Sequence, residues 1–265
     1  MKKNHMAYIG AGIIVVALVA AFLLLGSSSG AYSSNQPVPT AEMQQLQSIA
    51  TNYSLANHVG IGTTIPLGGH PNYPTPIVAP SLTNNSKPQV LYIGAEYCPY
   101  CAITRWAVVL TLMRFGTLSN LTYMTSTQND KFPNTPTFSF RSSTYSSRLV
   151  AFTAVETEDR NGQQLQQPSA FDGGIYSNYD PSGSIPFIDF ANSSVQVGAV
   201  ITPQVVAGMD QQQVISMLSN SSSPVALAII GNANVFTAYL CKASTSLSNT
   251  TACKQGYVTA VMNQH

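Results

Sequence analysis

The sequence predicts an α/β domain with an N-terminal transmembrane helix before it and a helical extension after it. Three observations predict this organisation. The apolar run Met6–Leu25 has the length of a helix that spans a hydrocarbon core. The continuous apolar run Val90–Ile93 is typical of a strand buried on both faces, and the apolar helical segment Ala102–Phe115 follows it. The segment beyond residue 220 contains two further apolar helical stretches.

The composition restricts the partners of the chain. Only 8% of the 265 residues are charged, against roughly 25% in a typical soluble domain. The net charge is +1, and no cluster of Lys or Arg could follow a phosphate backbone. We therefore expect no nucleic-acid partner. The polar residues are mostly Ser, Thr, Asn and Gln, which suits an acidic medium outside a cell but is equally compatible with a compositional bias of the lineage.

The apolar run near the N-terminus predicts a single-pass protein of the cell membrane. Lys2 and Lys3 precede the run and no positive charge follows before Lys87, so the rule for positive charges keeps the N-terminus in the cytosol and the bulk of the chain outside. A cleaved signal peptide is the alternative, but its apolar region is usually shorter. Both alternatives place the cysteines where thiols tend to pair. Sites for N-glycosylation agree with a surface location and occur at Asn52, Asn84, Asn120, Asn192, Asn220 and Asn249.

The predicted boundaries divide the chain into four parts. They are an anchor over 1–26, a stalk with a helix and a loop over 27–86, the α/β domain over 87–219 with a long insertion at about 131–183, and a C-terminal helical extension over 220–265.

Each element of this organisation has its own pattern. Met43, Leu46 and Ile49 predict a helix from Thr40 to about Ala56, and a loop rich in Pro and Gly follows it. His58 and His70 have no second ligand at metal-binding spacing and are expected at the surface or at a helix cap. The segments that we predict next are a helix over 102–115 ended by Gly116, a second strand over 121–125 that completes a βαβ unit, and a hairpin from 138–140 and 149–155. A solvated charged turn is expected from Glu156 to Gly162, and a strand–turn–strand is expected over 184–199. The last predicted segments are a helix capped by Asp210 and Gln213 and two helices over 225–240 and 251–262.

Cys98 and Cys101 form a Cys-x-x-Cys motif at the predicted start of a helix. Cys98 falls at the N-cap, where unpaired backbone N–H groups and the helix dipole stabilise a thiolate. Pro99 occupies the first turn, where its missing N–H is not needed. Cys101 lies about one turn further on and faces the same way. This arrangement favours a redox pair that uses no metal and no separate cofactor.

Two other interpretations of these cysteines are possible. A zinc site would need Cys241 and Cys253 as further ligands, and their spacing is not that of a zinc finger or ribbon. A purely structural bridge between Cys98 and Cys101 would close a small strained ring. Cys241 and Cys253 themselves are expected to form a structural disulfide, with a shuttle that re-oxidises the first pair as the alternative.

The string from Ala95 to Cys101, AEYCPYC, resembles the active-site turn of the thioredoxin superfamily, and its Pro-Tyr dipeptide is typical of glutaredoxins. Downstream, Ile185-Pro186 followed by a strand pair and Gly198 resembles the superfamily's cis-proline, its hairpin and the glycine before the last helix. The longer string YIGAEYCPYCAITRW is similar to largely uncharacterised, membrane-anchored prokaryotic thioredoxin-like proteins. The resemblance implies a thioredoxin-like fold with a long insertion before the cis-proline.

The resemblance also implies roles for the residues around the motif. Cys98 would be the attacking nucleophile, Cys101 the resolving thiol and Pro186 the cis-proline that faces them. Ile185 would offer backbone hydrogen bonds to an extended substrate. The turn residues that would border the substrate are Tyr97, Pro99 and Tyr100.

The chain departs from the superfamily pattern near the thiols. Tyr92 stands where thioredoxins keep a buried carboxylate as proton acceptor, and Glu96 is expected to be too exposed to replace it. Arg105 is expected to be an ordinary charge on the helix surface, with an influence on the thiol pKa values as the alternative. The turn Asn192-Ser193-Ser194 is not the Asn-Gly of the family, and more than 50 residues separate the predicted second strand from Pro186.

These observations predict an anchored thiol–disulfide oxidoreductase outside the cytoplasm. Its substrates would be protein thiols and disulfides, and an unidentified redox partner would set the direction. The predicted activity is that of an oxidase or isomerase, with a reductase for apo-cytochrome or copper-site cysteines as the enzymatic alternative. A surface-anchored binding or assembly subunit without enzymatic activity is the alternative from another class.

Overall fold

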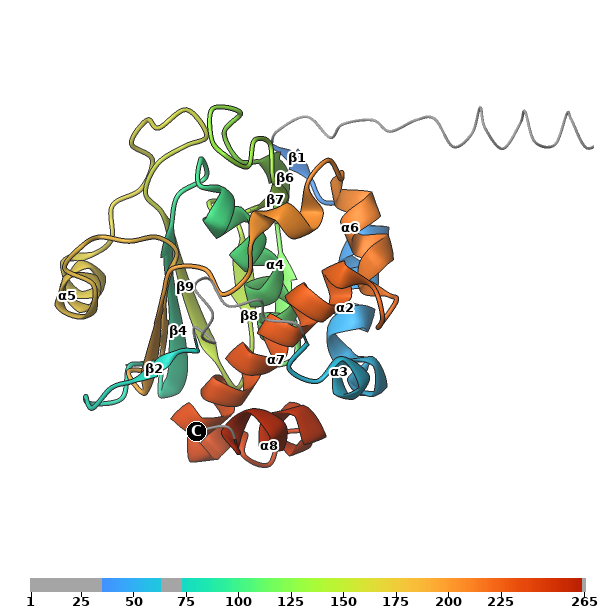
Figure 1. Cartoon of the computed structure of the whole chain (residues 1–265). Coiled ribbons are helices and arrows are strands. Elements are labelled where there is room, and N and C mark those ends of the chain that lie inside the picture. The colour runs from blue at the N-terminus through green and yellow to red at the C-terminus, as the bar shows by residue number, and fades with distance from the viewer. Residues whose placement is uncertain (1–34, 63–72, 264–265) are drawn as a thin grey trace, which may run out of the picture. The chain divides into compact units, whose positions relative to one another are not determined.

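A six-stranded mixed sheet lies at the centre of the folded unit, and helices cover both of its faces (Figure 1). The computed structural model describes residues 35–62 and 73–263, so the predicted anchor Met6–Leu25 and His70 lie outside the described residues. The strands are β1 (Gln36–Pro37), β2 (Thr75–Pro76), β3 (Thr83–Asn84), β4 (Lys87–Gly94), β5 (Thr117–Ser119), β6 (Thr122–Thr125), β7 (Pro136–Ser139), β8 (Thr144–Ser146), β9 (Ala151–Glu156), β10 (Phe187–Phe190) and β11 (Ser194–Val197). The α-helices are α2 (Thr40–Thr51), α3 (Tyr53–Val59), α4 (Pro99–Met113), α5 (Ala170–Tyr179), α6 (Gln211–Leu218), α7 (Pro224–Ala243) and α8 (Gly256–Met262).

Strand β4 is the axis of the main sheet. One of its edges pairs with β10 in antiparallel orientation, and β10 continues to β11 and β2. Its other edge pairs with β9 in parallel orientation over Gln89–Gly94. The short β3 pairs antiparallel with the start of β4 at Lys87 and Pro88. Residues 88–94 are all buried, as predicted for a strand covered on both faces. The protein is therefore of the α/β class with a mixed sheet.

The two faces of the sheet are covered by different helices (Figure 1). On one face, Ile175, Tyr176 and Tyr179 of α5 pack against a buried cluster that includes Leu91 and Phe187. On the other face, the Phe190 ring meets the Phe236 ring of α7 with centroids 5.3 Å apart, and α4 packs beside α7. The side chains of β10 thus alternate between the two layers, as the pleat of a strand requires.

Helix α4 is apolar on all sides because the protein covers it on all sides. A three-stranded sheet, β1-β6-β7, packs against α4 through β7. Trp106 of α4 packs on Phe138 at a centroid distance of 4.3 Å and donates through its indole nitrogen to the Pro136 carbonyl at 2.8 Å. Every residue of this helix except Tyr100 is buried, so the helix has no exposed face that would need a polar stripe.

Two predicted strand pairings are wrong. Strand β6 forms as expected, but it pairs antiparallel with β7 in the small sheet. The parallel partner of β4 is β9, so the crossover through α4 returns to the main sheet only at Ala151. The predicted hairpin between 138–140 and 149–155 is therefore absent, because its two strands belong to different sheets. The apolar side chains of β6 and β7 are used to cover α4.

Other segments differ from the prediction in detail. The predicted helix from Thr40 breaks into α2 and α3 at Asn52, whose side chain accepts a hydrogen bond from the Leu55 amide at 3.0 Å and caps α3. The predicted capping box of Asp210 and Gln213 is confirmed at the start of α6. Helix α7 is the one helix of the described residues that is long and apolar enough to cross a membrane. It is 83% buried over its most apolar window, as the central helix of a folded domain would be.

Asp189 of β10 is a buried carboxyl group with an incomplete set of partners. Its Oδ1 accepts from the Asn192 amide at 2.6 Å, whereas Oδ2 has no hydrogen-bond partner among the described residues. Burial raises the pKa of Asp189 to about 6, against 3.8 for the ordinary group. The folded state thus binds the proton of Asp189 more tightly than the unfolded state does, so the contribution of this group to stability is fully present below about pH 3.8 and is lost as the pH rises through about 6.

We expect Asp189→Asn to stabilise the protein at neutral pH. The amide keeps the acceptor for Asn192 and removes the buried charge, whose pKa difference corresponds to about 3 kcal/mol. Chemical unfolding at a series of pH values would show a gain of about 1–3 kcal/mol at pH 7 and a smaller dependence on pH between about 4 and 6. An equal loss of stability at pH 4 and pH 7 would contradict this account of Asp189.

Candidate active site

Cys98 and Cys101 lie at the junction of β4 and α4, where the chain leaves the sheet to begin the helix. Cys98 is the N-cap of α4, with Pro99 in the first turn, and both cysteines are free thiols. The Cys101 amide donates to Cys98 Sγ at 3.1 Å. The side chain of Cys98 keeps a small exposure of 6%, whereas Cys101 is completely buried. An incoming sulfur can therefore reach Cys98 first.

The surroundings of the two thiols move their pKa values in opposite directions. A side-chain hydrogen bond from Cys101 lowers the pKa of Cys98, and the Cys101 amide and the charge of Arg105 act in the same direction against the effect of burial. Burial raises the pKa of Cys101 well above its ordinary value, and its hydrogen bond to Cys98 adds to this increase. Cys98 is thus the thiol of the pair that loses its proton more readily, and Cys101 is the one that keeps it more firmly.

The Ile185–Pro186 peptide bond is cis and lies next to the thiol pair. Ile185, Tyr97 and Tyr100 pack against the buried cluster that contains Cys98 and Cys101, and all three remain partly exposed. The Pro186 carbonyl accepts from the Gly198 amide at 2.8 Å, which ties the start of β10 to the end of β11. Residues far apart in the sequence thus form a partly exposed apolar border around Cys98.

A buried ion pair lies behind the thiols. Arg105 and Glu156 are both completely buried, and the guanidinium donates from Nε and Nη2 to the two carboxylate oxygens at 2.9 and 2.6 Å. Arg105 Nη2 also donates to the Ala95 carbonyl at 2.7 Å, and Ala95 packs against both cysteines. Arg105 is therefore no surface charge, and Glu156 is no part of a solvated turn. The pair is buried because β9, rather than β6, brings Glu156 beside Gly94 of β4.

Two further buried residues with polar groups, Tyr92 and Glu96, lie near the thiol pair. Tyr92 is fully buried and its ring lies 5.9 Å from the Arg105 guanidinium carbon. Glu96 is only 6% exposed, so the predicted exposure of this residue is wrong. Its Oε1 accepts from the Ser139 hydroxyl at 2.5 Å, and burial raises the pKa of Glu96. The carboxyl group of Glu96 is thus held toward β7 of the small sheet.

The loop between β6 and β7 forms a further border of the site that the sequence pattern did not indicate. The Thr127 amide of this loop donates to the Tyr97 carbonyl at 2.9 Å. The Phe132 ring meets the Tyr100 ring edge to face at a centroid distance of 5.8 Å. A lone Phe in a polar loop gives no periodic signal, so only its position in space assigns it to the site.

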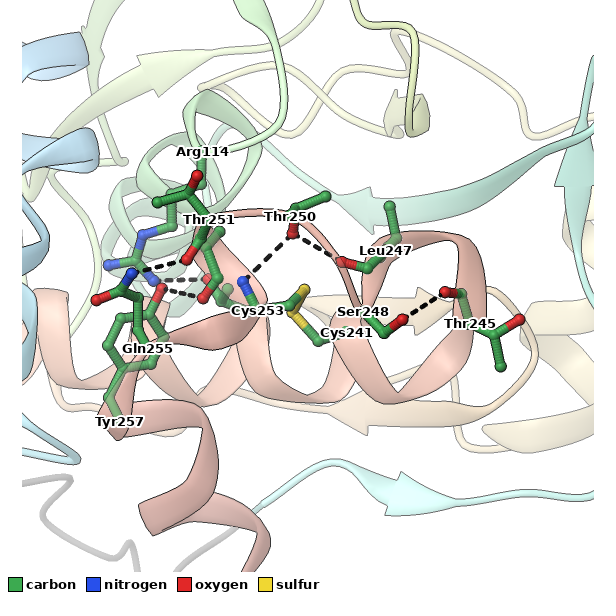
Figure 2. The surroundings of a disulfide bond; sticks show 12 residues. Arg114, Cys241, Thr245, Leu247, Ser248, Thr250, Thr251, Cys253, Gln255 and Tyr257 are labelled. Atoms are coloured by element: carbon green, nitrogen blue, oxygen red, sulfur yellow. Dashed lines mark hydrogen bonds between the residues drawn. A yellow bond between two sulfur atoms is a disulfide. The ribbon is translucent and has the colours of Figure 1, made fainter.

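The other two cysteines form a disulfide at the opposite end of α4 (Figure 2). Cys241 belongs to α7, and Cys253 lies in a short 3-10 turn before α8. Arg114, the C-cap of α4, lies over the Tyr257 ring at 4.8 Å. Because α4 has 15 residues, the disulfide and the thiol pair are separated by roughly 20 Å of helix. Direct exchange between the two pairs is not possible in this arrangement.

The described residues contain no group of three His, Cys, Asp or Glu side chains that could hold a metal ion. Cys241 and Cys253 are bonded to each other, so they are not free to complete a zinc site with Cys98 and Cys101.

We expect the double variant Cys241→Ala/Cys253→Ala to lose stability and to keep any activity of Cys98. A disulfide that closes a loop of this length contributes about 2–3 kcal/mol. Denaturant unfolding of oxidised wild-type and variant protein would measure the difference. A variant with unchanged stability but no turnover would contradict the structural role of this disulfide.

Comparison with known proteins adds one finding. A family described as "Domain of unknown function (DUF929)" matches residues 76–175. The matched segment contains β4, the thiol pair, α4 and β9, and it ends within α5 before Pro186. No curated protein and no solved structure matches the chain.

Proposed function

We propose that the protein is a membrane-anchored thiol–disulfide oxidoreductase with a thioredoxin-like fold that acts outside the cytoplasm on protein cysteines. The observation that carries the proposal is the free thiol pair at the start of α4, with Cys98, which keeps a small exposure of 6%, beside the cis peptide of Ile185 and Pro186. The two thiols have the opposite pKa shifts that a nucleophile and a resolving thiol need.

The order of elements also favours a thioredoxin-like fold. Strand β4, the thiol turn, α4 and the parallel strand β9 are followed by α5, the Ile-Pro peptide, the β10–β11 hairpin and Gly198. These are the features that the resemblance in sequence implies, in the same order. On this interpretation the elements β5 to β8 are an insertion between α4 and β9, earlier than the 131–183 segment predicted from sequence.

The proposed reaction proceeds through a mixed disulfide. The Cys98 thiolate attacks one sulfur of a substrate disulfide, and the other substrate sulfur leaves as a thiolate. Cys101 then attacks Cys98 Sγ, which forms the Cys98–Cys101 disulfide and releases the second substrate thiolate. The same steps in reverse oxidise a substrate dithiol. Anchoring at the membrane and the outward orientation rest on Met6–Leu25 and the distribution of Lys and Arg.

An exchange assay on the full chain in detergent tests this proposal. A fluorescent peptide with two cysteines is incubated with the protein in glutathione buffers of different redox composition, and both the gain and the loss of its disulfide are followed. We expect the protein to accelerate at least one direction, and the reduction potential of the pair then assigns the direction. A potential near −120 mV would indicate an oxidase, and one near roughly −200 mV would indicate an isomerase or exchange enzyme. No acceleration in either direction would instead favour a binding or assembly subunit.

A further inference from the structure

The anion of Cys101 is an obligatory and costly intermediate of the proposed reaction. During resolution of the mixed disulfide, Cys101 attacks as a thiolate. In the reverse direction, a substrate thiolate attacks Cys98 and Cys101 leaves as a thiolate. Cys101 has no exposed surface, so no bulk water stabilises this charge. Whatever the net direction, the protein itself has to provide donors or positive charge at this sulfur.

Two buried donors near the thiols have no hydrogen-bond partner among the described residues. They are Tyr92 Oη and Arg105 Nη1. The other nitrogens of the guanidinium are engaged, because Nε and Nη2 bind the Glu156 carboxylate and Nη2 binds the Ala95 carbonyl. A buried donor without a partner destabilises the folded state, so two such donors near the same pair of thiols need an explanation.

The positions of these donors point to Cys101. Arg105 follows Cys101 by four residues on α4, and side chains at this spacing are neighbours on one helix face. Tyr92 lies on β4 beneath the turn, and its hydroxyl occupies the space above Gly94, where any larger residue would collide with it. Ala95 connects Arg105 to the thiols, since its carbonyl accepts from Arg105 and it packs against Cys98 and Cys101.

We propose that Tyr92 and Arg105 stabilise the thiolate of Cys101, Tyr92 by donating a hydrogen bond and Arg105 by its fixed positive charge, while Glu156 positions the guanidinium. This inference rests on the proposed function. Arg105, a permanent cation, and Tyr92, a neutral donor, would thus take the place of the buried carboxylate that thioredoxins keep near the thiols as a proton acceptor. The Glu156 carboxylate is not suited to accept the proton, because Arg105 and the Phe140 amide already donate to it.

The phenol of Tyr92 is suited to this role. Burial raises its pKa well above the ordinary value, so Tyr92 keeps its proton at any pH at which the thiols react. Replacement of Tyr92 by Phe removes only the hydroxyl oxygen and leaves the ring contacts with Phe140 and Arg105 in place. Tyr257→Phe is the matched control, since Tyr257 is a buried Tyr whose hydroxyl donates to the Ala252 carbonyl near the disulfide.

A single-turnover reaction of the reduced full chain with Ellman's reagent separates the two chemical steps. Attack by Cys98 releases the first nitrothiobenzoate anion, and attack by Cys101 on Cys98 Sγ releases the second. We expect Tyr92→Phe to slow the second release by about tenfold or more, as loss of a hydrogen bond to a charged group would do. We also expect its pH profile to move to higher pH, with the first release nearly unchanged. Arg105→Lys, which keeps the charge but loses the fork of donors, should slow the second release as well.

The outcomes distinguish this proposal from the proposed function. Equal rates and equal pH profiles of the second release in wild type, Tyr92→Phe and Tyr257→Phe would overturn the role of Tyr92 while leaving the enzyme intact. A first release no faster than that of a free thiol in wild type would overturn both proposals. If Tyr92→Phe fails to fold, as judged by circular dichroism, the comparison of Arg105→Lys with wild type decides.

Discussion

Replacement of Cys98 by serine is expected to reduce thiol–disulfide exchange to the uncatalysed rate. Cys98 is the thiol with the lowered pKa and with some remaining exposure, whereas Cys101 is completely buried and has a raised pKa. No other described cysteine can take over, because Cys241 and Cys253 are bonded to each other. The exchange assay with the dicysteine peptide measures this loss directly.

The matched variant is Cys101→Ser, which keeps the nucleophile and removes the resolving thiol. We expect it to accumulate a mixed disulfide with the peptide at Cys98, which can be identified by mass spectrometry after non-reducing digestion. Full activity of Cys98→Ser, or adducts found only on Cys101 in wild type, would contradict the assignment of the nucleophile.

Glu156→Gln is expected to destabilise the protein by about 3–5 kcal/mol, because it leaves a buried guanidinium without its counter-charge. Arg105 and Glu156 are fully buried, and two short hydrogen bonds join them between α4 and the end of β9. Trp106 is the single tryptophan of the chain and directly follows Arg105, so its fluorescence reports denaturant unfolding at this position.

Two further variants test whether the loss comes from the unpaired charge. Glu158→Gln changes a partly exposed carboxylate two residues away and should alter stability by less than about 1 kcal/mol. The double variant Arg105→Met/Glu156→Leu removes both charges and should recover most of the loss, since buried pairs can often be replaced by apolar residues of similar size. A Glu156→Gln variant as stable as wild type would show that water reaches the ion pair.

The local features of the candidate site could be predicted from sequence because they depend on neighbours in the chain. An N-cap position, a proline in the first turn and a second thiol one turn later follow from the spacing of Cys98, Pro99 and Cys101. The apolar run before them has the length and composition of a strand buried on both faces, and β4 is such a strand.

The pairing of distant strands could not be predicted in this way. Leu121–Thr125 and Ala151–Glu156 have similar apolar patterns, and only the second pairs with β4. One feature of the sequence did indicate that strands outside the main sheet were needed. A helix as apolar as α4 has to be covered on every side, so strands outside the main sheet were needed near it.

The wrong prediction that Arg105 and Glu156 lie at the surface also follows from the pairing of distant strands. Charged residues are rarely buried without a partner, so each of them alone is expected at the surface. They are 51 residues apart in sequence, and only the return of the chain to β9 brings them together. Tyr92 was recognised as the residue in place of a carboxylate, but its free hydroxyl and its proximity to Arg105 required coordinates.

The most direct test of the central claim is the pH dependence of alkylation at each of the two cysteines. The reduced full chain is treated with iodoacetamide across a range of pH values, and the rates at Cys98 and Cys101 are resolved by mass spectrometry. We expect Cys98 to react with a midpoint clearly below that of an ordinary thiol, about 8.5, while Cys101 stays unreactive in the folded protein. A Cys98 midpoint at or above the ordinary value, or equal reactivity of both thiols, would contradict the central claim.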